Sequence, residues 1–116
     1  MNKKWAMKWA KALESGKYRK GREFLHKVDA SYHHKYCCLG VLCELVGGCD
    51  VEKVDNNYYY DGAMGFLPVA VKQEVGMDSL GGYIDSLRRD LADINDNDRK
   101  GFKEIAAIIR KNWKEL

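Results

Sequence analysis

Basic and aromatic residues alternate in the segment Lys17-Tyr18-Arg19-Lys20-Gly21-Arg22. This combination suits a nucleotide, because an aromatic ring can stack on a base while an arginine guanidinium contacts phosphate oxygens in a bidentate manner. A glycine inside the segment would let the main chain approach such a ligand. We therefore predict a ligand site built from this segment and nearby aromatic residues, with six candidate binding residues: Tyr18, Arg19, Arg22, Tyr58, Tyr60 and Trp9.

Some of these aromatic residues also have a purely structural interpretation. Trp9 lies on the apolar stripe of an expected helix, where it would pack in the core. Side chains alternate between the two faces of a strand, so members of the run Tyr58-Tyr59-Tyr60 are expected to point inward. Ligand binding and core packing both remain open for these residues.

Four cysteines fall within thirteen positions, close to the three histidines of the chain: Cys37, Cys38, Cys43 and Cys49, with His26, His33 and His34. A zinc site is one alternative, but its ligands usually come in pairs separated by a few residues, unlike the adjacent Cys37 and Cys38. A histidine-activated cysteine nucleophile is another alternative. Because cysteine is among the most buried residue types, we predict that these cysteines pack in the core, and we expect neither a metal nor a cofactor.

The acidic segment from Asp93 to Asp98 resembles a calcium-binding loop, with Glu104 at its twelfth place. The sixth place, however, is Asp98 where such a loop needs glycine, and the eighth is Lys100 where it needs an apolar residue. We predict instead that these side chains turn the chain and stabilise the next helix N-terminus. Without a phosphate loop or nucleophile elbow, the sequence favours a non-enzyme, and a hydrolase stays the minority alternative.

Apolar spacing predicts where helices form. A stripe over Lys4–Leu13 ends at Gly16, and the apolar run Tyr36–Val46 fits a buried helix that ends at Gly47. Three further helical segments are expected: one from Pro68 to Val75, one carrying Ile84, Leu87, Leu91 and Ile94, and a last one from Gly101, with Glu104 completing a capping box.

Strands are expected at Phe24–Val28 and, as two or three short ones, within residues 49–66. No linker or repeat divides the chain. We therefore predict a small single α+β domain spanning residues 1–116, with about four helices packed on a short antiparallel sheet or hairpin.

Charge is distributed unevenly along the 116 residues. Residues 1–36 carry a net +7, residues 37–98 a net −8 and residues 99–116 a net +4, so the basic ends would form one patch if the termini meet. The pI of about 8.6 is below that of a dedicated nucleic-acid domain, which disfavours a nucleic-acid partner. The sequence shows no apolar run long enough for a membrane span and no signal peptide, so we expect a cytosolic protein without a membrane partner.

Several of these signals, taken in order, resemble a family of small proteins encoded mainly by bacteriophages and prophages. The specific feature is the Cys-Cys-Leu-Gly-Val-Leu-Cys core at residues 37–43, and the weaker ones are Trp9, Ser15–Tyr18, Leu67-Pro68, Leu91–Asp96 and Phe102–Ile109. The chain departs from the usual pattern at Gly101, where serine is common, and in its basic, histidine-rich stretch before Tyr36. The resemblance implies a phage accessory protein acting in the host cytoplasm.

These observations lead to one expected function and its alternatives. We expect a non-catalytic protein that counters host antiviral defence by binding, and so sequestering, a small nucleotide-like signal. The first alternative is a protein–protein inhibitor of a host factor, which predicts an exposed apolar or acidic patch. Nucleic-acid binding is the weaker alternative, and a homo-oligomer is compatible with all three.

Overall fold

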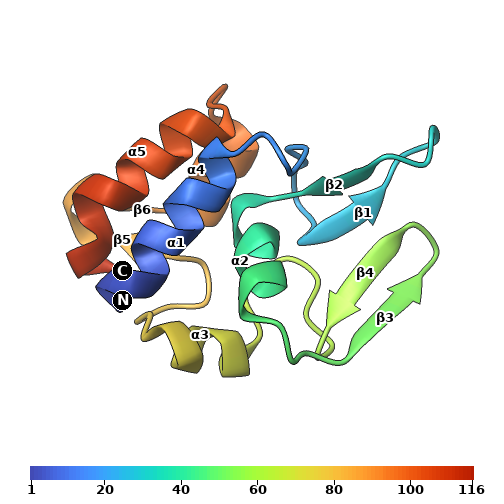
Figure 1. Ribbon diagram of the computed structural model, residues 1–116, viewed down its shortest axis with the longest axis horizontal. Helices are drawn as coiled ribbons and strands as arrows, with labels where there is room; N and C mark the ends of the chain where they lie inside the picture. The colour runs from blue at the N-terminus through green and yellow to red at the C-terminus, as the bar shows by residue number, and fades with distance from the viewer.

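The first and last helices pack against each other in the computed structural model, which describes residues 1–116 (Figure 1). Helix α1 (Lys3–Glu14) and helix α5 (Phe102–Asn112) follow the predicted stripes, and their apolar faces are buried: Ala6, Trp9, Ala10, Leu13, Phe102, Ile105, Ala106 and Ile109. The Met1 ammonium donates a hydrogen bond to the Leu116 carbonyl, so the two basic ends of the chain do meet.

Helix α2 (Cys38–Val46) is the predicted buried helix and lies between the other helices and the sheet (Figure 1). It begins two residues later than expected, because Tyr36 belongs to a strand. Cys37, Cys38 and Cys43 are buried, which confirms their place in the core, whereas Cys49 is only partly buried. The helix approaches a neighbouring segment so closely that a Cβ atom on Gly40 would lie 1.7 Å from the Leu25 carbonyl oxygen.

Four strands form an antiparallel sheet in the order β2-β1-β4-β3. They are β1 (His26–Val28), β2 (His34–Tyr36), β3 (Val51–Val54) and β4 (Asn57–Tyr60). Strands β1, β3 and β4 fall where the sequence predicts them. Strand β2 was not predicted, because it is an edge strand whose polar residues show no apolar alternation.

The segment after Gly82 differs from the prediction of one helix through Ile84, Leu87, Leu91 and Ile94. It forms a hairpin of β5 (Tyr83–Ile84) and β6 (Arg89–Asp90) around a 3₁₀ turn, η1 (Asp85–Leu87), before helix α4 (Leu91–Asn97) begins. The left-handed conformation of Arg88, with φ of 52°, interrupts any continuous helix. The helical spacing is kept by three buried residues that come from two different elements, Ile84 from β5 and Leu91 and Ile94 from α4.

The remaining helices follow their predicted signals. Helix α3 (Val69–Val75) starts after Pro68 and ends at Gly76, whose φ of 71° is left-handed. Glu104 does not complete a capping box in α5, where the Gly101 cap has no side-chain bond, and its carboxylate lies 3.8 Å from the Lys100 ammonium. A 3₁₀ turn, η2 (Trp113–Glu115), ends the chain. The domain is therefore α+β, with five α-helices where about four were predicted.

A buried amide holds the helices to the segment that precedes the sheet. Asn95, fully buried in α4, accepts a hydrogen bond from the Cys38 amide at 3.0 Å and donates one to the Gly21 carbonyl at 3.0 Å. The neighbouring acids Asp93 and Asp98 both bind the Arg89 guanidinium. The acidic segment thus has structural partners within the chain. No helix of the structure has the length and apolarity to span a membrane.

Candidate functional site

A buried histidine lies between two tyrosine rings on one face of the sheet. His26 stacks on Tyr36 with ring centroids 4.2 Å apart and on Tyr58 at 3.9 Å. The antiparallel register pairs His26 with Tyr36, and the two-residue period of the strands places His34 and Tyr60 on the same face. We call these five residues the histidine–tyrosine cluster: His26, His34, Tyr36, Tyr58 and Tyr60.

A chain of hydrogen bonds runs through this cluster to helix α2. The Tyr60 hydroxyl donates to a Glu44 carboxylate oxygen at 3.1 Å and lies 2.8 Å from Nδ1 of His26. Nε2 of His26 lies 2.7 Å from Nδ1 of His34. The order Glu44, Tyr60, His26, His34 thus connects an exposed carboxylate to an exposed imidazole through a buried core.

Burial keeps the middle of this chain uncharged. Desolvation, helped by the charge of protonated His34, lowers the pKa of His26 from 6.5 to about 4. Burial, with the nearby Glu44 carboxylate, raises the pKa of Tyr36 to about 12 and raises that of Tyr60 further. At neutral pH His26 therefore carries a single ring proton, and both phenols keep theirs.

This protonation gives the hydrogen-bond chain one direction. A carboxylate can only accept hydrogen bonds, so the Tyr60 hydroxyl donates its one hydrogen bond to Glu44. The Tyr60 oxygen then accepts a hydrogen bond from Nδ1–H of His26. Nε2 of neutral His26 then has a lone pair and accepts from Nδ1–H of His34. Nε2 is consequently the ring nitrogen of neutral His34 that keeps a free lone pair.

A surface hollow of about 480 Å³ opens beside His34, within the size range of small-molecule sites. We call it the basic–aromatic pocket, and it is lined by Lys17, Tyr18, Arg19, Tyr32, His33, His34, Tyr36 and Glu44. The segment after α1 is held along β2 by main-chain bonds from Tyr36 N to Arg19 O at 2.8 Å and from Gly21 N to Tyr36 O at 2.7 Å. These bonds fix Tyr18 edge-on to Tyr36, with centroids 5.3 Å apart.

The six predicted binding residues have three different locations. Tyr18 and Arg19 line the pocket, while Tyr58 and Tyr60 lie in the adjoining histidine–tyrosine cluster. Arg22 is exposed but does not line the pocket. Trp9 is fully buried, where its indole N–H donates to the Cys38 carbonyl at 2.8 Å, so its ring cannot stack on a ligand.

Sequence reasoning missed the residues at the centre of the site. His34 and Tyr36 line the pocket and His26 orients His34, yet the histidines were considered only as partners of the cysteines. Lys17 also lines the pocket and belongs to the predicted segment, although it was not among the six candidate binding residues. The available signal was the two-residue spacing of His34 and Tyr36, which is typical of one strand face.

The cysteines lie outside this chemistry. Burial is the main cause that raises the pKa of Cys37 and of Cys49 to about 11, and it raises that of Cys38 and Cys43 as well. A protonated thiol is a poor nucleophile, so these values argue against the cysteine-nucleophile alternative. The ring nitrogens of His26 are bonded within the cluster and do not face a thiol. No group of three or more His, Cys, Asp and Glu side chains is arranged to hold a metal ion.

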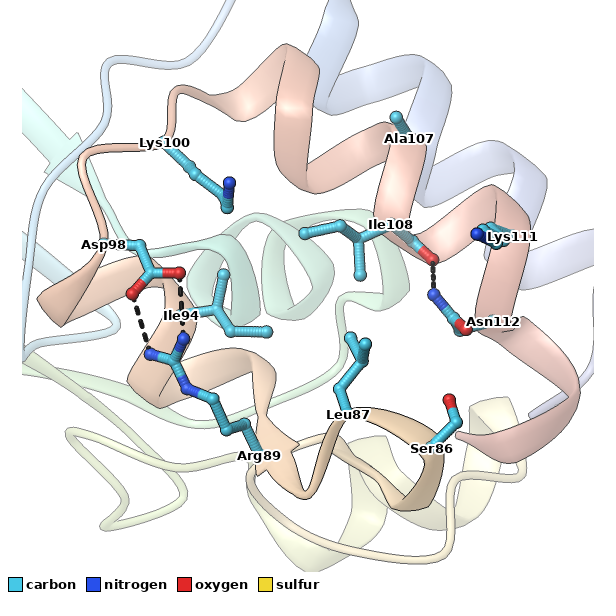
Figure 2. A pocket seen from close by; sticks show the side chains of 10 residues that line it. All are labelled: Ser86, Leu87, Arg89, Ile94, Asp98, Lys100, Ala107, Ile108, Lys111 and Asn112. Carbon is cyan, nitrogen blue, oxygen red and sulfur yellow. Dashed lines mark hydrogen bonds and ion pairs between the residues drawn. The ribbon is translucent and has the colours of Figure 1, made fainter.

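A larger cavity, of about 740 Å³, lies elsewhere, between α4, α5 and the turn at Ser86 (Figure 2). Its floor is apolar, formed by Leu87, Ile94 and Ile108. The Asp98 carboxylate at its edge is bonded to the Arg89 guanidinium by two contacts of 2.9 Å (Figure 2). This cavity has room for an apolar group, but its one carboxylate is already paired with Arg89. The basic–aromatic pocket is therefore the stronger candidate site.

A family model matches residues 1–113, which include the whole pocket and cluster. The chain belongs to the family described as a domain of unknown function (DUF8296). No curated protein and no solved structure shows a significant match to it. The function of this DUF8296 domain therefore has to be inferred from the geometry of its site.

Proposed function

We propose that this protein binds a small nucleotide-like anion in the basic–aromatic pocket. The observation that carries the proposal is the convergence of two cationic side chains, Lys17 and Arg19, with the rings of Tyr18 and Tyr36 around one hollow. Cations and aromatic faces together match a ligand that has a phosphate and a base.

The two cations are free to meet a ligand. Neither Lys17 nor Arg19 forms an ion pair in the structure, and the Lys17 ammonium lies 5.5 Å from the centre of the Tyr18 ring. The Glu44 carboxylate at the pocket wall accepts a hydrogen bond from the Tyr60 hydroxyl, which lessens the repulsion between this carboxylate and a bound anion. Arg19 can give a phosphate two parallel hydrogen bonds, and Lys17 adds a point charge.

The biological setting of the proposal comes from the sequence resemblance to phage-encoded proteins. In that setting the protein is a phage accessory factor that counters host antiviral defence. By binding a nucleotide-like signal in the host cytoplasm, it lowers the concentration of free signal that reaches the host receptor. Binding alone is sufficient for this function.

A protein-docking function has one observation in its favour. Phe66, Val69 and Leu80 are 53%, 56% and 38% exposed, and a main-chain bond from Leu67 N to Leu80 O joins their segments. Exposed apolar side chains are typical of protein interfaces where they form one continuous patch. These residues lie outside the lining of the basic–aromatic pocket, so substitutions can separate the two functions.

Isothermal titration with adenosine monophosphate, the dinucleoside monophosphate ApA and inorganic phosphate tests the proposal. We expect Arg19→Ala to weaken nucleotide binding at least about tenfold, because it removes charge-assisted hydrogen bonds. Arg22→Ala is the matched control, since it removes an equal charge outside the pocket and should leave affinity within about twofold. Absence of nucleotide binding by the unmodified protein, or equal losses in both variants, would contradict the proposal.

A further inference from the structure

We infer that His34 is a general base and that the basic–aromatic pocket cleaves a ribonucleotide phosphodiester next to a free 2′-hydroxyl. This activity rests on the proposed function, because the substrate must first bind in the same pocket. It goes beyond that function, because sequestration needs no proton acceptor.

The first support is the position of the open nitrogen. Nε2 of neutral His34 keeps a lone pair, since Nδ1–H donates to His26 at 2.7 Å. His34 lines the same hollow as the two cations Lys17 and Arg19. A residue with a proton-accepting nitrogen and two anion-binding residues therefore line one hollow, the combination that a phosphoryl-transfer site requires.

The second support is the way the cluster holds His34. His26 lies between two rings, is only 6% exposed and has both ring nitrogens bonded. Core packing alone would be served by an apolar residue, without the cost of burying an imidazole and satisfying both of its nitrogens. The hydrogen-bond chain positions His34 in the way that a buried carboxylate positions a catalytic histidine, because it fixes the tautomer and the orientation of the ring.

The direction of the hydrogen bonds in this chain favours protonation of His34 during the reaction. When His34 becomes an imidazolium, its Nδ1–H bond to His26 strengthens, and the Glu44 carboxylate lies at the far end of the same chain. His26, Tyr60 and Glu44 are thus positioning residues that act through His34. The charged groups that line the same hollow are Glu44 from α2 and Lys17 and Arg19 from the segment after α1. The titratable His33 also lines it and lies 3.5 Å from the Asp29 carboxylate.

The chemical step transfers one proton and exchanges one P–O bond for another. Nε2 of His34 takes the proton of the ribose 2′-hydroxyl, and the 2′-oxygen forms a bond to the adjacent phosphorus. The bond from phosphorus to the 5′-oxygen of the next nucleotide breaks, and water gives that oxygen a proton. Lys17 and Arg19 stabilise the extra negative charge on phosphorus oxygens in the transition state. The products are a 2′,3′-cyclic phosphate and a 5′-hydroxyl, and His34 returns its proton to solvent.

The experiment incubates the protein with ApA and, in parallel, with its deoxy analogue dApdA, which lacks the 2′-hydroxyl. Mass spectrometry should find adenosine 2′,3′-cyclic phosphate and adenosine from ApA, and titration should show that dApdA binds without cleavage. His34→Gln should lower cleavage of ApA at least about 100-fold, the usual contribution of a general base. Because His34 is exposed, this variant should keep the fold, as circular dichroism can verify.

Tyr60→Phe tests the positioning chain with little change in packing. It should lower kcat more than it raises KM and move the acidic limb of the pH–rate profile, effects that a merely structural tyrosine would not produce. Binding of both dinucleotides without product would overturn the inference and leave the proposed function standing. Binding of neither would overturn both, and undiminished cleavage by His34→Gln would show that His34 is not the base.

Discussion

At the scale of single residues, the burial of His26 makes the stability of the folded protein depend on pH. Its ring is stacked between Tyr36 and Tyr58, and the hydrogen bonds that satisfy it assume a neutral imidazole. A proton on His26 would place a charge in a buried site beside His34. The same arrangement that orients His34 therefore makes the fold sensitive to acid.

We expect the free energy of unfolding to fall by about 2 kcal/mol between pH 7 and pH 5 because of His26. The pKa of His26 is about 4 in the folded protein and 6.5 when unperturbed, so between these values the unfolded chain binds more protons. Stability from this group is fully present above pH 6.5 and is lost as the pH falls toward 4. Urea denaturation at several pH values measures the slope.

Two variants isolate the contribution of His26. His26→Gln should flatten the pH dependence of the free energy of unfolding over this range, whatever its effect on stability at pH 7. His33→Gln is the matched control, because the His33 side chain is 47% exposed and lies outside the cluster, so it should keep the slope. An unchanged slope in His26→Gln would show that another group titrates.

At the scale of elements, helix α2 is fixed by how closely its backbone approaches another segment. Its apolar residues are buried on nearly all sides, so the helix needs neighbours all around it. Gly40 lets the helix backbone meet the Leu25 carbonyl, one residue before β1 starts. The motif at residues 37–43 thus combines helix-forming apolar residues with one position that has no room for a side chain.

Gly40→Ala should destabilise the protein by at least about 3 kcal/mol, although alanine is the better helix former. The added Cβ would lie 1.7 Å from a backbone oxygen, and no rotamer change can relieve a contact between two such atoms. Gly101→Ala is the control, because its Cβ would have no neighbour within 4 Å. Chemical denaturation should show a lower free energy of unfolding for Gly40→Ala than for Gly101→Ala. Small and equal losses of stability in the two variants would contradict the packing of α2 on Leu25.

At the scale of the whole molecule, the helices and the sheet differ in how many residues they contribute to the hydrophobic core. Most of the core cluster of 24 buried residues comes from the helices and the loops between them. Strand β3 is exposed at all four positions, and β1 pairs with β4 through a single residue pair, Lys27 with Asn57. Strand β3 therefore has few buried contacts at the outer edge of the sheet, whereas β4 is tied to the core by Tyr60 (Figure 1).

We expect native-state hydrogen exchange to reveal local opening of strand β3. Amides of β3 should exchange through an opening whose free energy is smaller than that of global unfolding, whereas amides of α1 and α5 should report global unfolding. Measurement by NMR at low denaturant concentration separates the two classes. Equal protection of β3 and α5 amides would show that the sheet and the helices unfold together.

The sequence predicted those features that depend on neighbours along the chain. The stripes of α1 and α5, the apolar run of α2 and the glycine after α3 are local patterns, and each element formed close to its predicted bounds. Burial of Cys37, Cys38 and Cys43 was likewise predictable, because an apolar run of that length needs a core. Tyr18 and Arg19 were predicted together because they are adjacent.

Only the tertiary structure decided what surrounds the histidines. His26 is eight residues from His34 and 34 residues from Tyr60, and antiparallel pairing of β1 with β2 and β4 brings these side chains together. No local pattern encodes the partner strand, since register depends on which faces are buried when the sheet docks on α2. For the same reason Tyr36 became the wall of a pocket and not part of a buried helix. The chemistry of this site is a property of the packed sheet and helix, because its reactive nitrogen is selected by hydrogen bonds between distant residues.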